Sequence, residues 1–345
     1  MRVCLTIDTE FSIAGALADP ACLPVAAPMV HCDVDGRSQG LGFLLDCFRL
    51  HGVCATFFVE TQQRQYFRSD PMYPLVQAIA AAGHEVQLHV HPCWDVFRHA
   101  DWSARALRQP RQDDFAGRDA ASTLQLLRAG QAAFADWGLA PPQVFRSGSL
   151  QHDAALYLAL AAAGIPYSSC IGLAVYNSGA PQFQLHAGRH LLHGVLELPV
   201  LSFSDWRLWR PHLKTLTISG ASFAETRTLL ELAYRSGLEQ VVILTHPFEY
   251  VQSRRADFRQ LRRHAVNQRR LTRLCAWLGQ HRDRFQTSGM AAAAAVRLLP
   301  GSSHNPLLRG RPHQSVRRMA TQVAYDRYGD LALAWRAWNA WSAAC

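Results

Sequence analysis

The chain has 345 residues, of which 49% are hydrophobic and 18% are charged. This length and composition allow one large barrel or about two ordinary domains, and they argue against global disorder. The formal net charge of +9 favours anionic partners. Nucleic acid is not an expected partner, because the chain has no zinc-finger spacing, ribonucleoprotein motif or stripe of basic and aromatic residues.

The first ten residues, MRVCLTIDTE, have the pattern of an apolar strand that ends in acidic residues, rather than of a secretion signal. No uninterrupted run of about 18 apolar residues predicts a membrane span. The nine cysteines are dispersed without a CxxC pair, which is typical of reduced thiols rather than of a disulfide framework. We therefore expect a cytoplasmic protein without a membrane span.

Four stretches then repeat one order of elements: an amphipathic helix, a glycine and a short apolar strand. They cover residues 40–60, 73–91, 122–149 and 223–247, and 153–170 is a weaker fifth copy. In each stretch the glycine can take the positive φ that ends a helix. Alternating helices and strands of this length predict an α/β fold with a parallel sheet and helical crossovers. Periodicity alone does not decide between a closed barrel and an open sheet.

Four of the predicted strands end in ionisable residues. These residues are Asp8 and Glu10, His89 and His91, Arg146, and His246. In βα barrels the catalytic groups gather at the C-terminal ends of several strands. Four such ends in one chain favour a common site over coincidence.

Two of these strand ends carry pairs that suit a metal ion. Residues two apart on an extended chain point the same way, so Asp8 and Glu10 share one side, as do His89 and His91. Two histidines and one carboxylate are a common catalytic zinc set that leaves one position open. Taken alone, the acidic pair could instead be exposed acids, and the histidine pair could include a buried structural histidine. Cys93 is a rival ligand.

The other two strand ends suit proton transfer and orientation. His246 precedes a proline and could act as a general acid that protonates a leaving amine, or it could be a core histidine. Arg146 could hold a carboxylate base by a bidentate contact, and a structural salt bridge explains it almost as well.

Residues 1–290 resemble the polysaccharide deacetylase family, also called carbohydrate esterase family 4 or the NodB-homology domain. The resemblance rests on LTIDTE, ATFFVE, GHEVQLH, FRSGS, LELPV and LTHP, in this order. The form LHVHPCW is most similar to the WalW-like branch, which is associated with surface-polysaccharide genes. The resemblance implies a distorted (β/α)7-type barrel that removes N-acetyl groups from sugars, a hydrolysis of non-peptide C–N bonds, with one divalent metal.

Carried over by position, the resemblance makes Asp8 the base, Glu10 and His89 metal ligands, Arg146 the residue that tethers the base, and His246 the acid. The sequence departs from the family pattern at two points. The family motif has paired aspartates where this chain has Asp8-Thr9-Glu10, and its second histidine stands where this chain has Cys93. We therefore expect His91 to supply the remaining ligand. The expected metal is zinc, and no organic cofactor is expected.

The expected substrate is a sugar or a surface-polysaccharide precursor, anionic or lipid-linked. We assign Trp94 and Trp206 to substrate binding. Two alternatives remain at this stage: a catalytically weak carbohydrate-binding or scaffold protein, and a hydrolase of non-sugar amides on the same fold. Metal content and acetate release distinguish them.

Two further segments complete the chain. Apolar residues recur at helical spacing between Arg254 and Arg284, which predicts a helix that packs on the barrel and turns its arginines outward, including Arg262, Arg263, Arg269 and Arg270. A solvated basic face and a surface for an anionic glycan are both consistent with this pattern. Residues 291–345 break the repeat, and we expect them to form a C-terminal extension, partly helical or flexible.

Overall fold

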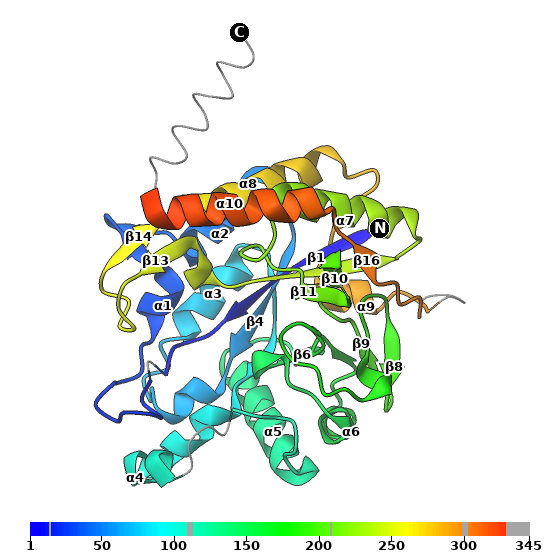
Figure 1. Ribbon diagram of the computed structural model, residues 1–345. Coiled ribbons are helices and arrows are strands. Elements are labelled where there is room, and N and C mark those ends of the chain that lie inside the picture. The colour runs from blue at the N-terminus through cyan, green and yellow to red at the C-terminus, as the bar shows by residue number, and fades with distance from the viewer. Residues whose placement is uncertain (14, 109–112, 208, 299–302, 329–345) are drawn as a thin grey trace.

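A computed structural model describes residues 1–13, 15–108, 113–207, 209–298 and 303–328. A curled parallel sheet forms its centre, and helices cover the outside of the sheet (Figure 1). The parallel strands, in spatial order, are β12 (Gln240–Thr245), β1 (Arg2–Thr9), β4 (Ala55–Glu60), β5 (Glu85–Val90), β6 (Val144–Ser147), β7 (Tyr167–Ser168) and β9 (Val195–Glu197).

The two ends of this sheet approach each other, so the sheet curls into a distorted barrel. Isolated parallel bridges join Val200, just after β9, to Val242, and Thr217 to Leu244. The backbone N–H of Leu201 also donates to the carbonyl of Val242 at 3.1 Å. The α/β class and the distorted barrel of seven parallel strands are therefore confirmed.

Shorter strands extend or flank the barrel. They are β2 (Asp33–Val34), β3 (Arg37–Ser38), β8 (His190–Leu192), β10 (Ser202–Arg207), β11 (Pro211–Thr215), β13 (Val251–Ser253), β14 (Leu261–Arg263), β15 (Gln286–Thr287) and β16 (Leu308–Arg309). Strand β8 pairs antiparallel with β9, and β15 pairs with the start of β1.

The helices follow the repeat that the sequence predicts. They are α1 (Ala27–His31), α2 (Leu41–His51), α3 (Tyr73–Ala81), α4 (Trp102–Arg108), α5 (Ala120–Asp136), α6 (Ala154–Ala163), α7 (Phe223–Arg235), α8 (Ala265–Gln280), α9 (Met290–Ala294) and α10 (Pro312–Tyr328). Helix α2 ends at Gly52, whose φ of 59° is the left-handed conformation that glycine adopts without strain. Strand β4 follows directly with all six residues buried, as expected of a parallel strand covered on both faces.

The segment between Arg254 and Arg284 is not one helix, so that prediction is wrong. Strands β13 and β14 form an antiparallel hairpin, and α8 begins only at Ala265. The side chain of His264 accepts a hydrogen bond from the backbone N–H of Asn267 at 3.3 Å, which caps the helix at this point. The guanidinium of Arg270 is buried, although we predicted that it faces solvent.

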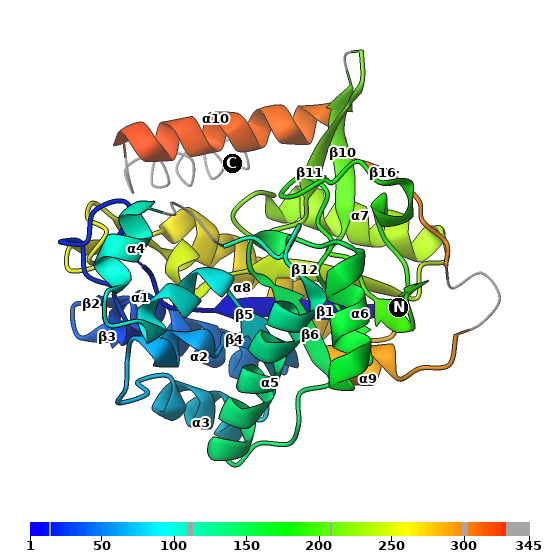
Figure 2. The same cartoon turned by 90° about the horizontal axis from the view of Figure 1, so that it is seen from below.

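The chain beyond Met290 packs on the barrel instead of trailing from it. Strand β16 pairs in parallel with β10, and α10 lies beside the β10–β11 hairpin (Figure 2). Tyr325 of α10 is buried, and its hydroxyl accepts a hydrogen bond from the N–H of Ala265 at 3.0 Å. The division at residue 290 stays a prediction, and residues 329–345 lie outside the described residues. Within the described ranges, no helix is long and apolar enough to cross a bilayer.

Candidate active site

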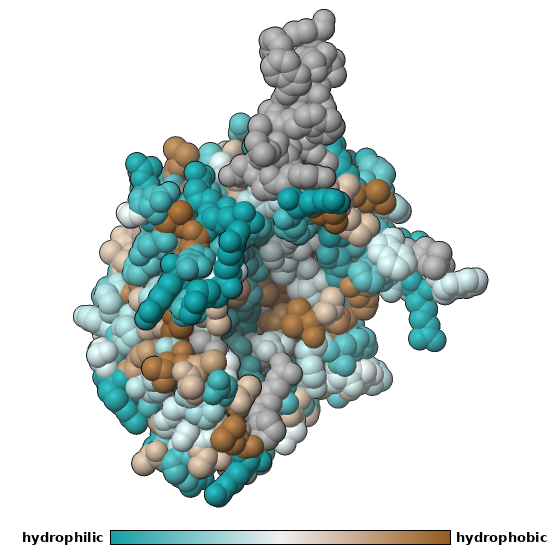
Figure 3. Space-filling model, turned by 60° about the vertical axis from the view of Figure 1, so that its left-hand side comes forward, coloured by the Kyte–Doolittle hydropathy of each residue, from teal (hydrophilic) through white to brown (hydrophobic). Residues whose placement is uncertain are grey.

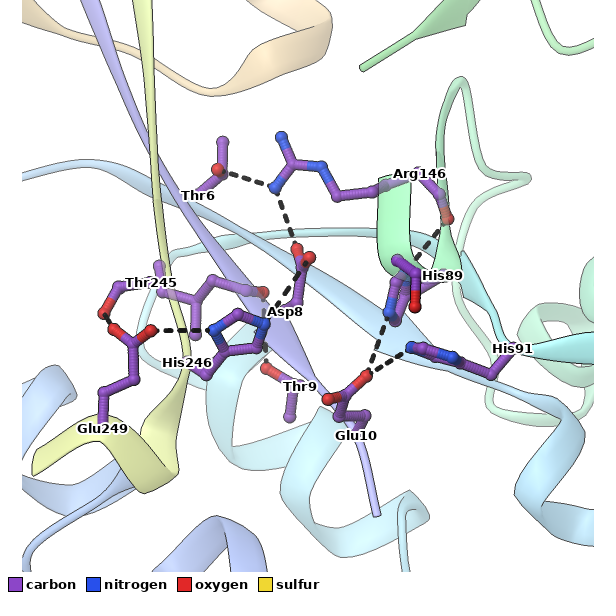
Figure 4. A network of polar contacts seen from close by, with 12 residues as sticks. Thr6, Asp8, Thr9, Glu10, His89, His91, Arg146, Thr245, His246 and Glu249 are labelled. Atoms are coloured by element: carbon purple, nitrogen blue, oxygen red, sulfur yellow. Dashed lines mark hydrogen bonds and ion pairs between the residues drawn. The ribbon is translucent and has the colours of Figure 1, made fainter. Parts of the chain in front are cut away.

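The four predicted strand ends meet at one rim of the barrel. Strands β1, β4, β5 and β6 are adjacent and parallel, and the register pairs His89 with Arg146. Strand β12 lies on the other side of β1 and leads into His246. Figure 4 shows that the side chains of Asp8, Glu10, His91 and His246 all point into this rim. The structure therefore brings together all six residues that the strand ends predict.

Glu10, His89 and His91 form a group that can hold a metal ion. The Oε2 atom of Glu10 lies 2.7 Å from His91 Nε2 and 3.2 Å from His89 Nε2. All three ligand atoms lie within 4.8 Å of one another, and His89 is buried. Burial alone would raise the pKa of Glu10, but the charge of His91 and the hydrogen bonds to both histidines hold it well below its usual range.

The second nitrogen of each histidine has its own acceptor. Nδ1 of His89 lies 2.9 Å from the carbonyl oxygen of Arg146, and Nδ1 of His91 lies 2.8 Å from a carboxylate oxygen of Asp113. Such acceptors hold the proton on Nδ1 and leave the Nε2 lone pair for a metal ion. Two imidazole nitrogens and a carboxylate oxygen are a common ligand set of catalytic zinc. The donor set therefore fits one divalent ion.

Cys93 belongs to a second group, with His91 and Asp113, that could also hold an ion. Burial raises the pKa of the Cys93 thiol, whereas a metal ligand must be a thiolate. Glu10 does not belong to this group. The set of Glu10, His89 and His91 is therefore the better candidate, as the sequence predicts.

Arg146 positions Asp8 through a single contact. Its Nη1 donates to Asp8 Oδ1 at 2.8 Å and to Thr6 Oγ1 at 2.8 Å. Its Nη2 and Nε donate to Ser169, and the guanidinium lies 4.2 Å above the ring centre of Phe58. The prediction of a bidentate contact is thus wrong, because the other two nitrogens bind Ser169, which follows β7. A fully buried arginine with these contacts holds the Asp8 carboxylate in one orientation.

His246 faces Asp8 on one side and Glu249 on the other. Its Nε2 lies 4.0 Å from Asp8 Oδ2, and its Nδ1 lies 3.2 Å from Glu249 Oε1. Thr245 and Ser219 donate hydrogen bonds to Glu249 at 2.7 and 2.9 Å, which fixes that carboxylate. Burial lowers the pKa of His246, but the hydrogen bond to Glu249 and the charges of Glu249, Asp8 and Glu10 outweigh it and raise the pKa to about 9. The ring is therefore protonated at neutral pH.

Three further carboxylates, which were not among the predicted site residues, belong to the site. Glu60 ends β4 and is buried, and it accepts the backbone N–H groups of His91 and of Gln62. Its position at a strand end is the signal that would have identified it. Asp113 lies in an irregular segment and Glu249 in a short 3₁₀ turn, where no periodic signal marks them.

The rings of the two tryptophans pack against other aromatic side chains. Trp94 is 1% exposed and packs against Phe67 and Phe97, so a ligand reaches it only by displacing the core. Trp206 is 41% exposed on β10, where its ring stacks on His212 at 4.8 Å. A packing role explains Trp94, and substrate binding by Trp206 stays a prediction.

No family model matches the chain, and no curated protein matches it. Solved structures do resemble it. A Mycobacterium smegmatis protein provisionally described as a polysaccharide deacetylase is 18% identical, with a TM-score of 0.48 over 85% of this chain and 88% of that chain. A family 4 carbohydrate esterase from Streptomyces lividans, in complex with acetate, is 16% identical, with a TM-score of 0.43 over 86% and 96%. An allantoinase is 11% identical, with a TM-score of 0.49 over 85% and 88%.

Proposed function

We propose that the protein is a metal-dependent hydrolase that removes N-acetyl groups from a sugar. One observation carries this proposal: a candidate metal group, an oriented carboxylate and a protonated histidine share one rim. The metal group is Glu10, His89 and His91, the carboxylate is Asp8, and the histidine is His246. Amide hydrolysis requires these three functions together, which are an electrophile, a base and an acid.

A divalent ion, with zinc expected first, would lower the pKa of a water molecule and polarise the substrate carbonyl. Asp8, oriented by Arg146, accepts a proton from the attacking water. His246 is charged at neutral pH and donates its proton to the leaving nitrogen. A C–O bond forms as the C–N bond breaks, so the products are acetate and a free amine.

The sequence resemblance to polysaccharide deacetylases supports a carbohydrate as the substrate. We propose a surface-polysaccharide precursor, as expected of the WalW-like branch, and a reaction in the cytoplasm. The arginine-rich segment between Arg254 and Arg284 supports a precursor that is anionic or lipid-linked. The family motifs assign the chemistry to five of the strand-end residues, which are Asp8, Glu10, His89, Arg146 and His246. His91 is the ligand that we expect in place of the family's second histidine.

The test combines elemental analysis of the purified protein with an acetate-release assay on N-acetylated oligosaccharides. We expect one zinc ion per chain and release of acetate. The variant His89→Ala should lose the metal and the activity while its circular dichroism stays unchanged. Unaltered metal content in this variant contradicts the ligand assignment. Bound metal without acetate release favours a carbohydrate-binding or scaffold role, and amide hydrolysis without metal favours the metal-free alternative.

A further inference from the structure

The β13–β14 hairpin directly follows the segment that contains His246, the candidate acid. The 3₁₀ turn η5 (Pro247–Tyr250) follows His246 and contains Glu249, and β13 begins at the next residue, Val251. Asn267 donates from Nδ2 to the carbonyl of Glu249 at 2.8 Å, which ties this turn to α8. The base of the hairpin is therefore a fixed part of the rim.

The hairpin is strongly basic, and most of its arginines have no ion-pair partner among the described residues. Its five arginines are Arg254, Arg255, Arg259, Arg262 and Arg263, and all of them are exposed. Asp257 is the one carboxylate between Val251 and Arg263, and it pairs with Arg255 at 3.0 Å, whereas Arg263 donates to Gln268. Among the described residues, no carboxylate lies within 4.0 Å of the guanidinium groups of Arg254, Arg259 or Arg262.

Two of these three arginines share one face of the hairpin. Gln252 pairs with Arg262, and the N–H of Arg254 donates to the carbonyl of Gln260 at 3.4 Å, which extends the same register. Alternate residues of a strand point to the same side, so Gln252, Arg254 and Arg262 lie together. Diagonal neighbours on such a face are about 7–8 Å apart, within the reach of two long side chains around one anion.

Gln252, the third residue of this face, has a side-chain atom without a hydrogen-bond partner among the described residues. Gln252 Oε1 is shielded from solvent but accepts no hydrogen bond from any described residue. Buried polar atoms in proteins are nearly always paired, so this carbonyl oxygen is an unsatisfied acceptor beside the two arginines. Cationic donors and an acceptor therefore lie side by side.

The side of the molecule that carries the hairpin is hollowed (Figure 3). Figure 3 turns forward the side of the molecule on which β13 and β14 lie in Figure 1, and hydrophilic side chains there border a hollow. The neighbouring β2–β3 turn carries Asp33 and Asp35, but neither makes an ion pair with the hairpin in the described structure. The five arginines of the hairpin therefore outnumber the three aspartates Asp33, Asp35 and Asp257.

We propose that Arg254 and Arg262 bind an oxyanion on the carbohydrate substrate, so that the substrate is a phosphate-linked or carboxylate-bearing glycan rather than a neutral one. This inference rests on the proposed deacetylation, because it places the anion on the same substrate molecule as the acetylated sugar. Arginine suits this role, since its planar fork matches both carboxylate and phosphate oxygens. Arg270 of helix α8 does not take part, because it is buried and donates to the carbonyl of Ser219 and to Asn267.

The test measures binding of three probes to the zinc-loaded full chain by calorimetry at 0.1 M and 1 M salt. The probes are neutral chitotetraose, N-acetylglucosamine 1-phosphate and a hyaluronan tetrasaccharide, which separate phosphate from carboxylate. We expect at least one anionic probe to bind more tightly than chitotetraose at low salt. The advantage should shrink at high salt, where the screening length falls from about 10 Å to about 3 Å.

Two double variants with the same change of net charge give the matched comparison. R254Q/R262Q should weaken binding of the anionic probe by about tenfold or more, because charge-assisted hydrogen bonds are lost, and should leave chitotetraose unaffected. R227Q/R235Q alters exposed arginines of α7 and should leave all three affinities unchanged.

Equal affinity for neutral and anionic probes, or equal losses in the two double variants, overturns the inference. Acetate release from chitotetraose by the wild type separates this outcome from failure of the proposed function. A further outcome is that acetate release is absent for every probe while R254Q/R262Q still weakens binding of the anionic probe. That result supports the proposed anion-binding surface and contradicts the proposed deacetylation.

Discussion

Gly148 lies directly against the imidazole ring of His91. A Cβ atom added at Gly148 would lie 2.7 Å from His91 Cγ and Cε1, which is closer than real Cβ contacts allow. Gly148 has no left-handed φ, so an alanine there meets no backbone strain and tests this steric contact alone. The glycine of the FRSGS motif therefore leaves the space that His91 occupies.

The first prediction is that Gly148→Ala displaces the His91 ring and weakens zinc binding. We expect a loss of about 10–100-fold, the range seen when the support of a metal ligand is removed. Competition with a chromogenic chelator measures the affinity. Gly310→Ala is the control, because its added Cβ meets nothing closer than 3.5 Å. Equal zinc affinities in both variants contradict the placement of His91.

The second prediction concerns Asp113, which accepts a hydrogen bond from His91 Nδ1. Asp113→Asn keeps the size of the side chain but removes the negative charge, so the ring loses its strongest orienting partner. Zinc affinity should fall by about 10–100-fold while the ligand count stays the same. Asp114→Asn, which changes the neighbouring carboxylate that binds Gln151, should have little effect. A similar loss in both variants would mean that overall charge matters and orientation does not.

The strand-end residues of the site were predictable from the sequence for a simple geometric reason. A strand has a period of two, so Asp8 and Glu10, or His89 and His91, share a side whatever the rest of the fold does. Parallel pairing then brings all C-terminal ends to one edge. Asp113 could not be found in this way, because its contact with His91 depends on the path of the irregular residues 113–119 before α5.

The arginine-rich segment shows where sequence patterns fail. Leucine and arginine spacing between Arg254 and Arg284 suits a helix, and α8 does occupy its second half. The first half forms a hairpin, because Val251 pairs with Arg263 and the cap at His264 starts the helix late. Both arrangements satisfy the same local composition, and only the tertiary contacts of the rim decide between them.

The third prediction is that Asp8→Asn keeps the metal but loses activity. The amide oxygen can still accept the hydrogen bond from Arg146 Nη1, whereas it cannot take a proton from water. Acetate release should fall by about 10²–10⁴-fold, the usual contribution of a general base. Asp95→Asn, a carboxylate paired with Arg98 outside the rim, is the control with the same change of charge. Normal turnover by Asp8→Asn would assign the activation of water to another group.

The fourth prediction concerns the pH dependence that Glu249 imposes on His246. The pKa of His246 is raised to about 9 against the depressing effect of burial, by the hydrogen bond and charge of Glu249 and by the charges of Asp8 and Glu10. The protonated acid is therefore present below about pH 9, and kcat should fall as the pH rises through this value. The same raised pKa stabilises the fold: its contribution is complete below the unfolded pKa of about 6.5 and is lost as the pH rises through about 9.

Glu249→Gln removes the carboxylate that contributes most to the raised pKa of His246, so the basic limb of the kcat profile should move to lower pH. Glu231→Gln, which removes an equal charge from a pair with Arg284 away from the rim, should leave the limb in place. Carbon-13 chemical shifts of labelled His246 report the same titration without turnover. A basic limb that stays at the wild-type pH in Glu249→Gln, together with an unmoved His246 resonance, would show that the proton reaches the leaving amine from another residue.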